Sequence, residues 1–157
     1  MSDGDARPCL LAHPSLQASD DSGRSQMNDL VVALARALLS AIFIVVGFNK
    51  IMAIGGTVAY LGRLGVPSPQ IVAWIVAIFE LVAGLMVLVG FRARWAAFAL
   101  AVFTGVTIYL AHPFWATPSA QYTNQFNHAM KNVAIIGGFL LLAVFGPGRF
   151  SIDGGRR

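Results

Sequence analysis

Of the 157 residues, 57% are hydrophobic and only 11% are charged, against about 25% charged residues in soluble domains, and this composition indicates a membrane protein. The net charge of +4 does not indicate a nucleic-acid partner, because the basic residues are scattered along the chain rather than gathered in a patch. A single cysteine, Cys9, excludes an intrachain disulfide and a paired-thiol redox motif.

Residues 1–28 are polar, rich in Asp, Ser, Pro and Gly, and show no sustained hydrophobic periodicity. This composition predicts a disordered leader, and it lacks the continuous apolar stretch and the cleavage site of a signal peptide. Met27 stands directly before the first hydrophobic segment, which leads to the hypothesis that Met27 is the physiological start of the protein.

Residues 29–157 contain four apolar segments of roughly 17–20 residues, the length that a helix needs to cross a hydrocarbon core of about 30 Å. The segments cover residues 30–48, 71–90, 95–111 and 129–145. Between the first two, Val58, Leu61 and Leu64 recur at helical spacing before two prolines, which predicts a short helix lying at the membrane interface. The predicted fold is therefore an all-α membrane four-helix bundle with a short interfacial helix between helices 1 and 2.

The loops of this bundle differ in charge and composition. The leader, the second loop and the C-terminal segment carry seven lysines and arginines, against two in the first loop and none in the third. Because cytoplasmic loops carry the basic excess, both termini are predicted to face the cytoplasm. The third loop, residues 112–128, is rich in aromatic and amide side chains, which suit the lipid headgroup region.

Glu80, the only glutamate of the chain, lies in the middle of the second segment. A charge at such a position costs about 2.5–3.5 kcal/mol unless it faces a partner inside the protein. Glu80 shares its helix face with Ala73, Ala77 and Gly84, and such small residues allow a neighbouring helix to approach. Depth along the helices predicts Arg36 as the partner of Glu80, and a planar guanidinium suits a carboxylate well.

Polar residues of the other segments are predicted to converge on the same interior. The candidates for a buried polar network or a ligand-binding site are Arg36, Glu80, Lys131, Asn132, Lys50 and His112. One interpretation is that the network only fixes the helix register, and another is that it forms a proton-, quinone- or substrate-linked site. Alternatively, Glu80 is protonated and uncharged at rest. His112 and His128 have no third ligand nearby in sequence, so no metal or haem site is expected, and no catalytic residue is identified.

Five motifs follow one another between residues 30 and 153. They consist of an Arg-Gly-Lys opening helix, the loop LGVPSP, a Glu-x-x-x-Gly second helix, a Lys-Asn pair with a following Gly-Gly, and the closing GPGRFSID. The motif residues are Arg36, Gly47, Lys50, Glu80, Gly84, Lys131, Asn132, Gly137, Gly138, Gly146, Pro147, Gly148, Arg149, Ser151 and Asp153. In this order the chain resembles the DoxX family of small four-helix membrane proteins.

The resemblance implies a bacterial inner-membrane protein associated with quinone-linked oxidation of sulfur compounds or with thiol-stress defence. The expected role is a non-catalytic subunit or assembly partner of such an oxidoreductase system, in contact with the bilayer, a redox partner protein or a second copy of the chain. Because the sequence offers no haem, flavin or cysteine site, quinone is the one cofactor considered. The alternatives are a small-molecule or proton-coupled carrier, with Glu80 as the protonatable group, and a purely structural scaffold.

The closing motif has a structural interpretation without the family. Gly146, Pro147 and Gly148 are predicted to end the last helix, because glycine adopts a left-handed cap and proline cannot continue the hydrogen-bond ladder. Arg149 is then predicted to lie against phosphates of the inner leaflet.

Overall fold

The computed structural model describes the backbone of residues 14–154 and the side chains of residues 26–154. Within this part of the chain there are five α-helices, one 3-10 helix and no strand, which confirms the predicted all-α class. The elements are α1 (Pro14–Met52), α2 (Ile54–Arg63), α3 (Pro69–Val89), α4 (Ala93–Ala111), η1 (Phe114–Ala116) and α5 (Ser119–Phe145).

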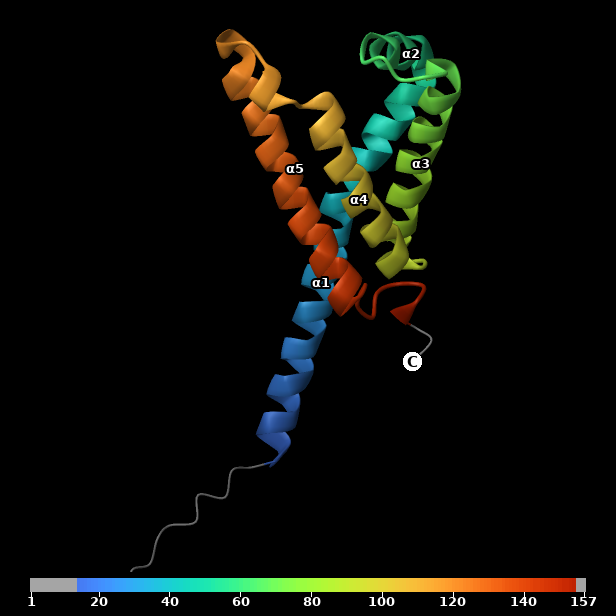
Figure 1. The fold of residues 1–157 in the computed structure, drawn as a ribbon. Helices are drawn as coiled ribbons and strands as arrows, with labels where there is room; N and C mark the ends of the chain where they lie inside the picture. The colour runs from blue at the N-terminus through green and yellow to red at the C-terminus, as the bar shows by residue number, and fades with distance from the viewer. Residues whose placement is uncertain (1–13, 155–157) are drawn as a thin grey trace, which may run out of the picture.

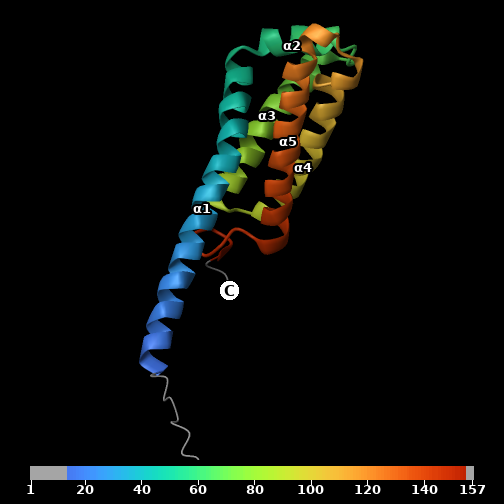
Figure 2. The same cartoon turned by 90° about the vertical axis from the view of Figure 1, so that its left-hand side faces the viewer.

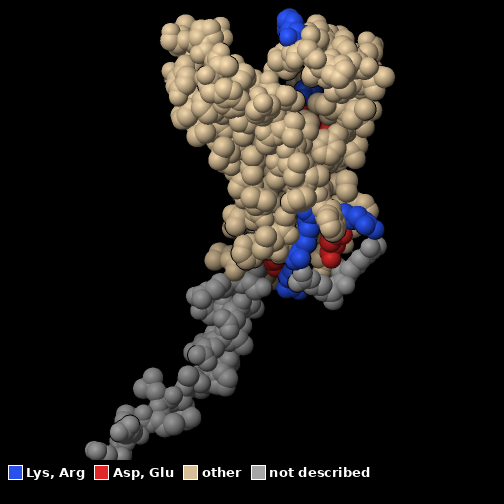
Figure 3. Space-filling view, viewed as in Figure 1, with Lys and Arg blue, Asp and Glu red and all other residues tan. Residues whose placement is uncertain are grey.

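The long helices α1, α3, α4 and α5 are apolar and long enough to cross a membrane. The surface that they present is almost free of charge along its middle, and the described charged side chains gather toward its ends (Figure 3). The short helix α2 lies across one end of the bundle, as its amphipathic spacing predicted (Figures 1 and 2). The prediction of a membrane four-helix bundle with an interfacial helix is therefore confirmed.

The four long helices form two closely packed pairs, α1 with α3 and α4 with α5, which are joined mainly by packing of α3 on α4. In Figure 1 the α4–α5 pair diverges from α1 and α3 toward the end of the bundle that carries α2. At the opposite end the C-terminal segment runs beneath the bundle (Figures 1 and 2). We call the end beneath which the C-terminal segment runs the tied end, and the end that carries α2, where the two helix pairs diverge, the open end.

Glycines set the close crossing of α1 and α3. A Cβ atom on Gly47 would lie 2.7 Å from the backbone nitrogen of Leu81, and one on Gly84 would lie 3.0 Å from Cγ1 of Ile44. Small residues let helix backbones approach in a membrane, where the hydrophobic effect does not drive helices together. Gly47 and Gly84 therefore hold α1 and α3 at a distance that a larger side chain would increase.

Two helix boundaries differ from the predicted ones. Helix α1 begins at Pro14, so the part of the predicted disordered leader from residue 14 to residue 28 is helical, while residues 1–13 lie outside the described residues. Helix α5 begins at Ser119, ten residues before the predicted 129. Hydropathy marks only the part of a helix that crosses lipid, and an existing helix extends into polar sequence without a new nucleation cost.

Candidate functional site

Arg36 lies near the tied end of the bundle and is only 4% exposed. Its guanidinium donates hydrogen bonds to the carbonyl oxygens of Pro147 at 2.6 Å, Phe150 at 2.7 Å and Leu88 at 3.2 Å. Arg36 therefore binds the end of α3 and the segment after α5, and the predicted Arg36–Glu80 pair is wrong.

Glu80 instead forms an ion pair with Lys50. The Lys50 Nζ atom lies 2.7 Å from Oε1 and 2.8 Å from Oε2 of Glu80. The Glu80 side chain is 5% exposed and the Lys50 side chain is 26% exposed. The ion pair thus joins α1 to α3 inside the membrane-spanning part of the bundle, with its cation partly open to a cavity.

The direction of the side chains explains why the prediction from depth along the helices gave Glu80 the wrong partner. In an α-helix the Cα–Cβ bonds tilt toward the N-terminus, so long side chains reach back along the helix. Since α1 and α3 run in opposite directions, Lys50 reaches down α1 toward Glu80, and Glu80 reaches up α3 toward Lys50. Arg36 also reaches back along α1, which takes its guanidinium away from Glu80 and toward the tied end.

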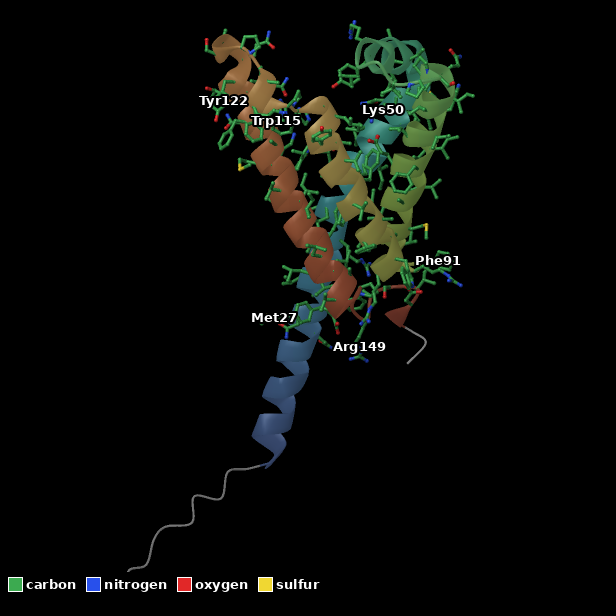
Figure 4. All side chains as sticks on the ribbon, in the orientation of Figure 1. Met27, Lys50, Phe91, Trp115, Tyr122 and Arg149 are labelled. Atoms are coloured by element: carbon green, nitrogen blue, oxygen red, sulfur yellow. The ribbon has the colours of Figure 1, made fainter. Side chains whose placement is uncertain are left out.

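The Lys50–Glu80 pair forms part of the wall of a cavity of about 270 Å³ to which all five α-helices contribute; we call it the Lys50 cavity. Figure 4 places Lys50 where α1, α2 and α3 come together, at the open end of the bundle. The polar lining residues are Lys50, Tyr60, Glu80, Thr104, Thr107, His112 and Asn132. The apolar lining includes Phe43 and Phe103, so the cavity combines aromatic surface with several hydrogen-bonding groups.

The polar groups of the Lys50 cavity differ in what they can still bind. The hydroxyls of Thr104 and Thr107 donate to carbonyl oxygens of their own helix, at 2.7 and 2.8 Å, so toward a ligand they act as acceptors. Lys50 uses two of its three N–H donors on Glu80 and keeps one. Asn132 and Tyr60 add an amide and a hydroxyl, which both donate and accept.

His112 also lines the cavity, at the C-terminal end of α4. Its Nδ1 lies 2.9 Å from Oε1 of Gln125; in the tautomer with the proton on Nδ1, the ring donates this hydrogen bond and Nε2 is left as an acceptor. The ring stacks on His128 with centroids 5.1 Å apart. Within the described residues no three His, Cys, Asp or Glu side chains group as metal ligands would.

Lys131 was predicted to belong to the buried network but lies outside it. The residue is exposed, and its Nζ lies 3.4 Å from Nδ1 of His128. One position along α5 turns the helix by about 100°, so Asn132 rather than Lys131 lines the Lys50 cavity. Three polar lining residues were not predicted: Tyr60 lies on the interfacial helix, and Thr104 and Thr107 continue the small-residue face of Ala97 and Ala101.

The closing motif forms the turn after α5 and contacts the start of α4. Helix α5 ends at Phe145, directly before the glycines that were predicted to end it. Gly146 has a positive φ of 90°, but its ψ of 178° differs from that of the predicted left-handed cap; Gly148 also has a positive φ, of 74°. A carboxylate oxygen of Asp153 accepts a hydrogen bond from the backbone N–H of Ala93 at 3.2 Å, at the start of α4. The motif thereby connects the end of α5 to the α3–α4 turn.

The two glycines in the middle of α5 have different surroundings. A Cβ atom on Gly138 would lie 2.9 Å from Cδ2 of Leu39, whereas one on Gly137 would meet nothing within 4 Å. Gly138 therefore allows α5 to approach α1, and Gly137 has no such role within the bundle.

Comparison with known proteins gives a consistent result. The DoxX family model matches residues 31–113 of this chain. The Inner membrane protein YphA of Escherichia coli (strain K12) is 38% identical, and the match covers 79% of this chain and 89% of that protein. The Inner membrane protein YqjF of the same strain is 39% identical over 82% of this chain and 93% of that protein.

A more distant relative has a name that refers to chemistry. The Putative oxidoreductase CatD of Bacillus subtilis (strain 168) is 32% identical, over 57% of this chain and 67% of that protein. No solved structure matches this chain significantly.

Proposed function

This chain belongs to the DoxX family, and on that premise we propose that it is a non-catalytic membrane subunit of an oxidoreductase system that holds a quinone-type ring in the Lys50 cavity. The names of its relatives, two inner membrane proteins and one putative oxidoreductase, support the location and the class of partner. The electron-transfer chemistry would belong to the quinone and to the partner protein.

The observation that carries the proposal is the composition of the cavity wall. A quinone offers two carbonyl oxygens on a flat apolar ring, and the cavity offers the remaining Lys50 donor, the Asn132 amide and the aromatic faces of Phe43 and Phe103. Its volume of about 270 Å³ is just below the roughly 300–1,000 Å³ of pockets for drug-sized ligands. The space therefore suits one substituted ring, whose apolar tail would remain in the bilayer.

The residues of the wall also match the charge changes that such a ring undergoes. Lys50 would stabilise negative charge on a ring oxygen, and Glu80 holds Lys50 in place through two hydrogen bonds. In the tautomer with the proton on Nδ1, Nε2 of His112 would accept a hydrogen bond from a ring hydroxyl, which a reduced ring has and an oxidised ring lacks. The cavity could therefore bind both redox forms.

We further propose that the tied end of the bundle faces the cytoplasm. Arg92, Arg94 and Arg149 lie at that end, and Lys50 and Arg63 lie at the other. This distribution supports the orientation with both termini inside. The Lys50 cavity would then open toward the outer leaflet.

The proposal is tested by mass spectrometry of the organic extract from protein purified in mild detergent, scored as quinone per chain. We expect close to one quinone per chain in the wild type and a loss of most of it in Asn132→Leu and His112→Phe, which alter the wall but not the ion pair. Lys131→Gln is the matched control, because it changes an exposed side chain of the same helix that does not line the cavity. Phospholipid alone in the wild-type extract, or equal quinone in all variants, would overturn the proposal.

A proton-coupled carrier is the second candidate, and the position of Glu80 in a cavity wall favours it. Four spans are few for alternating access, so this function would require a homodimer. Uptake into proteoliposomes driven by a pH gradient, present in the wild type and absent in Glu80→Gln, would favour the carrier. A purely structural scaffold would show neither bound quinone nor uptake.

A further inference from the structure

A second polar hollow lies at the tied end of the bundle, far from the Lys50 cavity. It has a volume of about 470 Å³, and its lining includes Arg92, Arg94 and Arg149 together with Asp29 and Asp153. Figure 4 shows Arg149 at this end and Lys50 at the other, and Figure 3 shows the basic side chains gathered there. The three arginines and two carboxylates leave one net positive charge in the lining.

Both carboxylates of this hollow already have partners on the backbone. Asp153 accepts the N–H of Ala93 at 3.2 Å, and Asp29 accepts the N–H of Arg149 at 3.2 Å. The Asp29–Arg149 ion pair is long, at 4.0 Å, and its arginine side chain is 77% exposed. Within the described residues Arg92 and Arg94 form no ion pair at all, so the guanidinium groups can bind an added anion.

The three arginines of the hollow come from the α3–α4 turn, from α4 and from the segment after α5. Arg92 lies in the α3–α4 turn with a left-handed φ of 45°, which brings it beside the first turn of α4. The Arg94 side chain crosses to the end of α5, where a Cβ atom on Gly146 would lie 3.0 Å from its Nη2. Arg149 follows α5 by four residues and completes the cluster.

An apolar groove of about 770 Å³ follows the outer face of α3 and α4, and Trp95 lines both this groove and the arginine hollow. The groove extends along α3 from Ile71 to Met86, which corresponds to about 22 Å of helix. Half of the hydrocarbon core measures about 15 Å, so the groove is long enough for one acyl chain. Its other lining residues are hydrophobic; Ile71, Ile75 and Ile78 are among those exposed on the surface that faces lipid, whereas Ala83 and Ala96 are buried.

We propose that the arginine hollow and the α3–α4 groove form one binding site for a lipid with an anionic phosphate headgroup. The phosphate binds Arg92, Arg94 and Arg149, because a guanidinium offers paired donors that match phosphate oxygens. One acyl chain lies in the groove against α3. Trp95 lies at the boundary between headgroup and chain, a position that tryptophan favours in membrane proteins.

Charge and continuity favour this occupant over others. A free phosphate would use the hollow and leave the groove without a role, whereas a second protein chain packed in the groove would not need the arginines. A zwitterionic lipid would bring an ammonium group close to three guanidinium groups. This site is independent of the proposed quinone site, because the two share no lining residue.

Native mass spectrometry of the full-length, delipidated protein tests the proposal, with phosphatidylglycerol and phosphatidylcholine of identical acyl chains as probes. We expect phosphatidylglycerol to bind at least about fivefold more tightly, with a loss of about fivefold for each of R94Q and R149Q. R92N is a third variant, because asparagine tolerates the left-handed conformation of Arg92. R63Q, at the opposite end of the bundle, is the matched control and should leave the preference unchanged.

Two further measurements distinguish a bound lipid from a free phosphate. A99F narrows the groove without touching the arginines and should weaken phosphatidylglycerol binding, while glycerol phosphate should compete only at far higher concentration. Equal binding of the two lipids, or a preference that survives R94Q and R149Q, would overturn the proposal. Competition by glycerol phosphate at concentrations similar to the lipid, with no effect of A99F, would show a free-phosphate site and overturn the lipid assignment.

Discussion

The two ends of the bundle satisfy buried charge in different ways. At the tied end, Arg36 donates three hydrogen bonds to backbone carbonyl oxygens, which belong to α3 and to the segment after α5. At the open end, Lys50 and Glu80 satisfy each other across a cavity that retains unused donors and acceptors.

The difference teaches what each charge is for. Backbone carbonyls cannot leave their places, so the Arg36 contacts fix how the chain closes on itself. Lys50 keeps one N–H donor while Glu80 holds the other two, so a ligand can bind at the open end without breaking the ion pair. We therefore expect variants at the tied end to affect stability most strongly and variants at the open end to separate stability from ligand binding.

Arg36→Met should give the largest effect. It leaves the carbonyl oxygens of Leu88, Pro147 and Phe150 without their donor, and hydrogen bonds to charged groups contribute about 1.5–3 kcal/mol each. Since such contributions are not additive, we expect a loss of about 3–5 kcal/mol in the free energy of unfolding, measured by denaturation in mixed micelles. The free energy of unfolding of Arg36→Lys should lie between those of Arg36→Met and the wild type. Equal stability of Arg36→Met and the wild type would contradict the role of Arg36.

Lys50→Met should cost less, about 2 kcal/mol, because the charge it strands on Glu80 borders a cavity that water can enter. The double variant Lys50→Met/Glu80→Gln should recover most of that loss, since no unpaired charge remains. A double-mutant cycle by the same denaturation measurement checks the coupling. Independent, additive effects of the two changes would argue against the ion pair.

Gly47→Ala tests the close crossing of α1 and α3, the two helices that the Lys50–Glu80 ion pair joins. Its Cβ atom would lie 2.7 Å from the Leu81 backbone nitrogen, so the two helices must separate, at a cost of about 1–2 kcal/mol. Gly137→Ala is the control, because nothing lies within 4 Å of its added atom and alanine favours the helix. A thermal melt compares the melting temperatures of the two variants. If helix propensity alone decided stability, the two substitutions would change the melting temperature equally.

Asp153→Ala should give the smallest of these effects, about 1 kcal/mol, through loss of the acceptor for the Ala93 N–H at the start of α4. Asp153→Asn keeps a side-chain oxygen and should stay close to the wild type. The melting temperatures of the two variants, compared with each other, measure this cap separately from the Arg36 contacts.

The four membrane-spanning helices and the interfacial helix α2 were predictable, because length, apolar composition and helical spacing are local properties of the sequence. The involvement of Glu80, Lys50, Asn132 and His112 in one polar region was also foreseeable, as polar groups in spanning helices turn inward. The polar N-terminal parts of α1 and α5 were not predictable, because hydropathy does not detect the part of a helix that continues outside the lipid.

The sequence by itself determined that this protein crosses a membrane as four helices, since the length and the hydropathy of the apolar segments decide this. Only the tertiary structure decided the partners. Side-chain direction in antiparallel helices paired Glu80 with Lys50 rather than with Arg36, and one position of rotation along α5 placed Asn132 in the cavity and Lys131 outside. Distances of a few ångströms between helices are fixed by packing of the whole bundle, which no local pattern records.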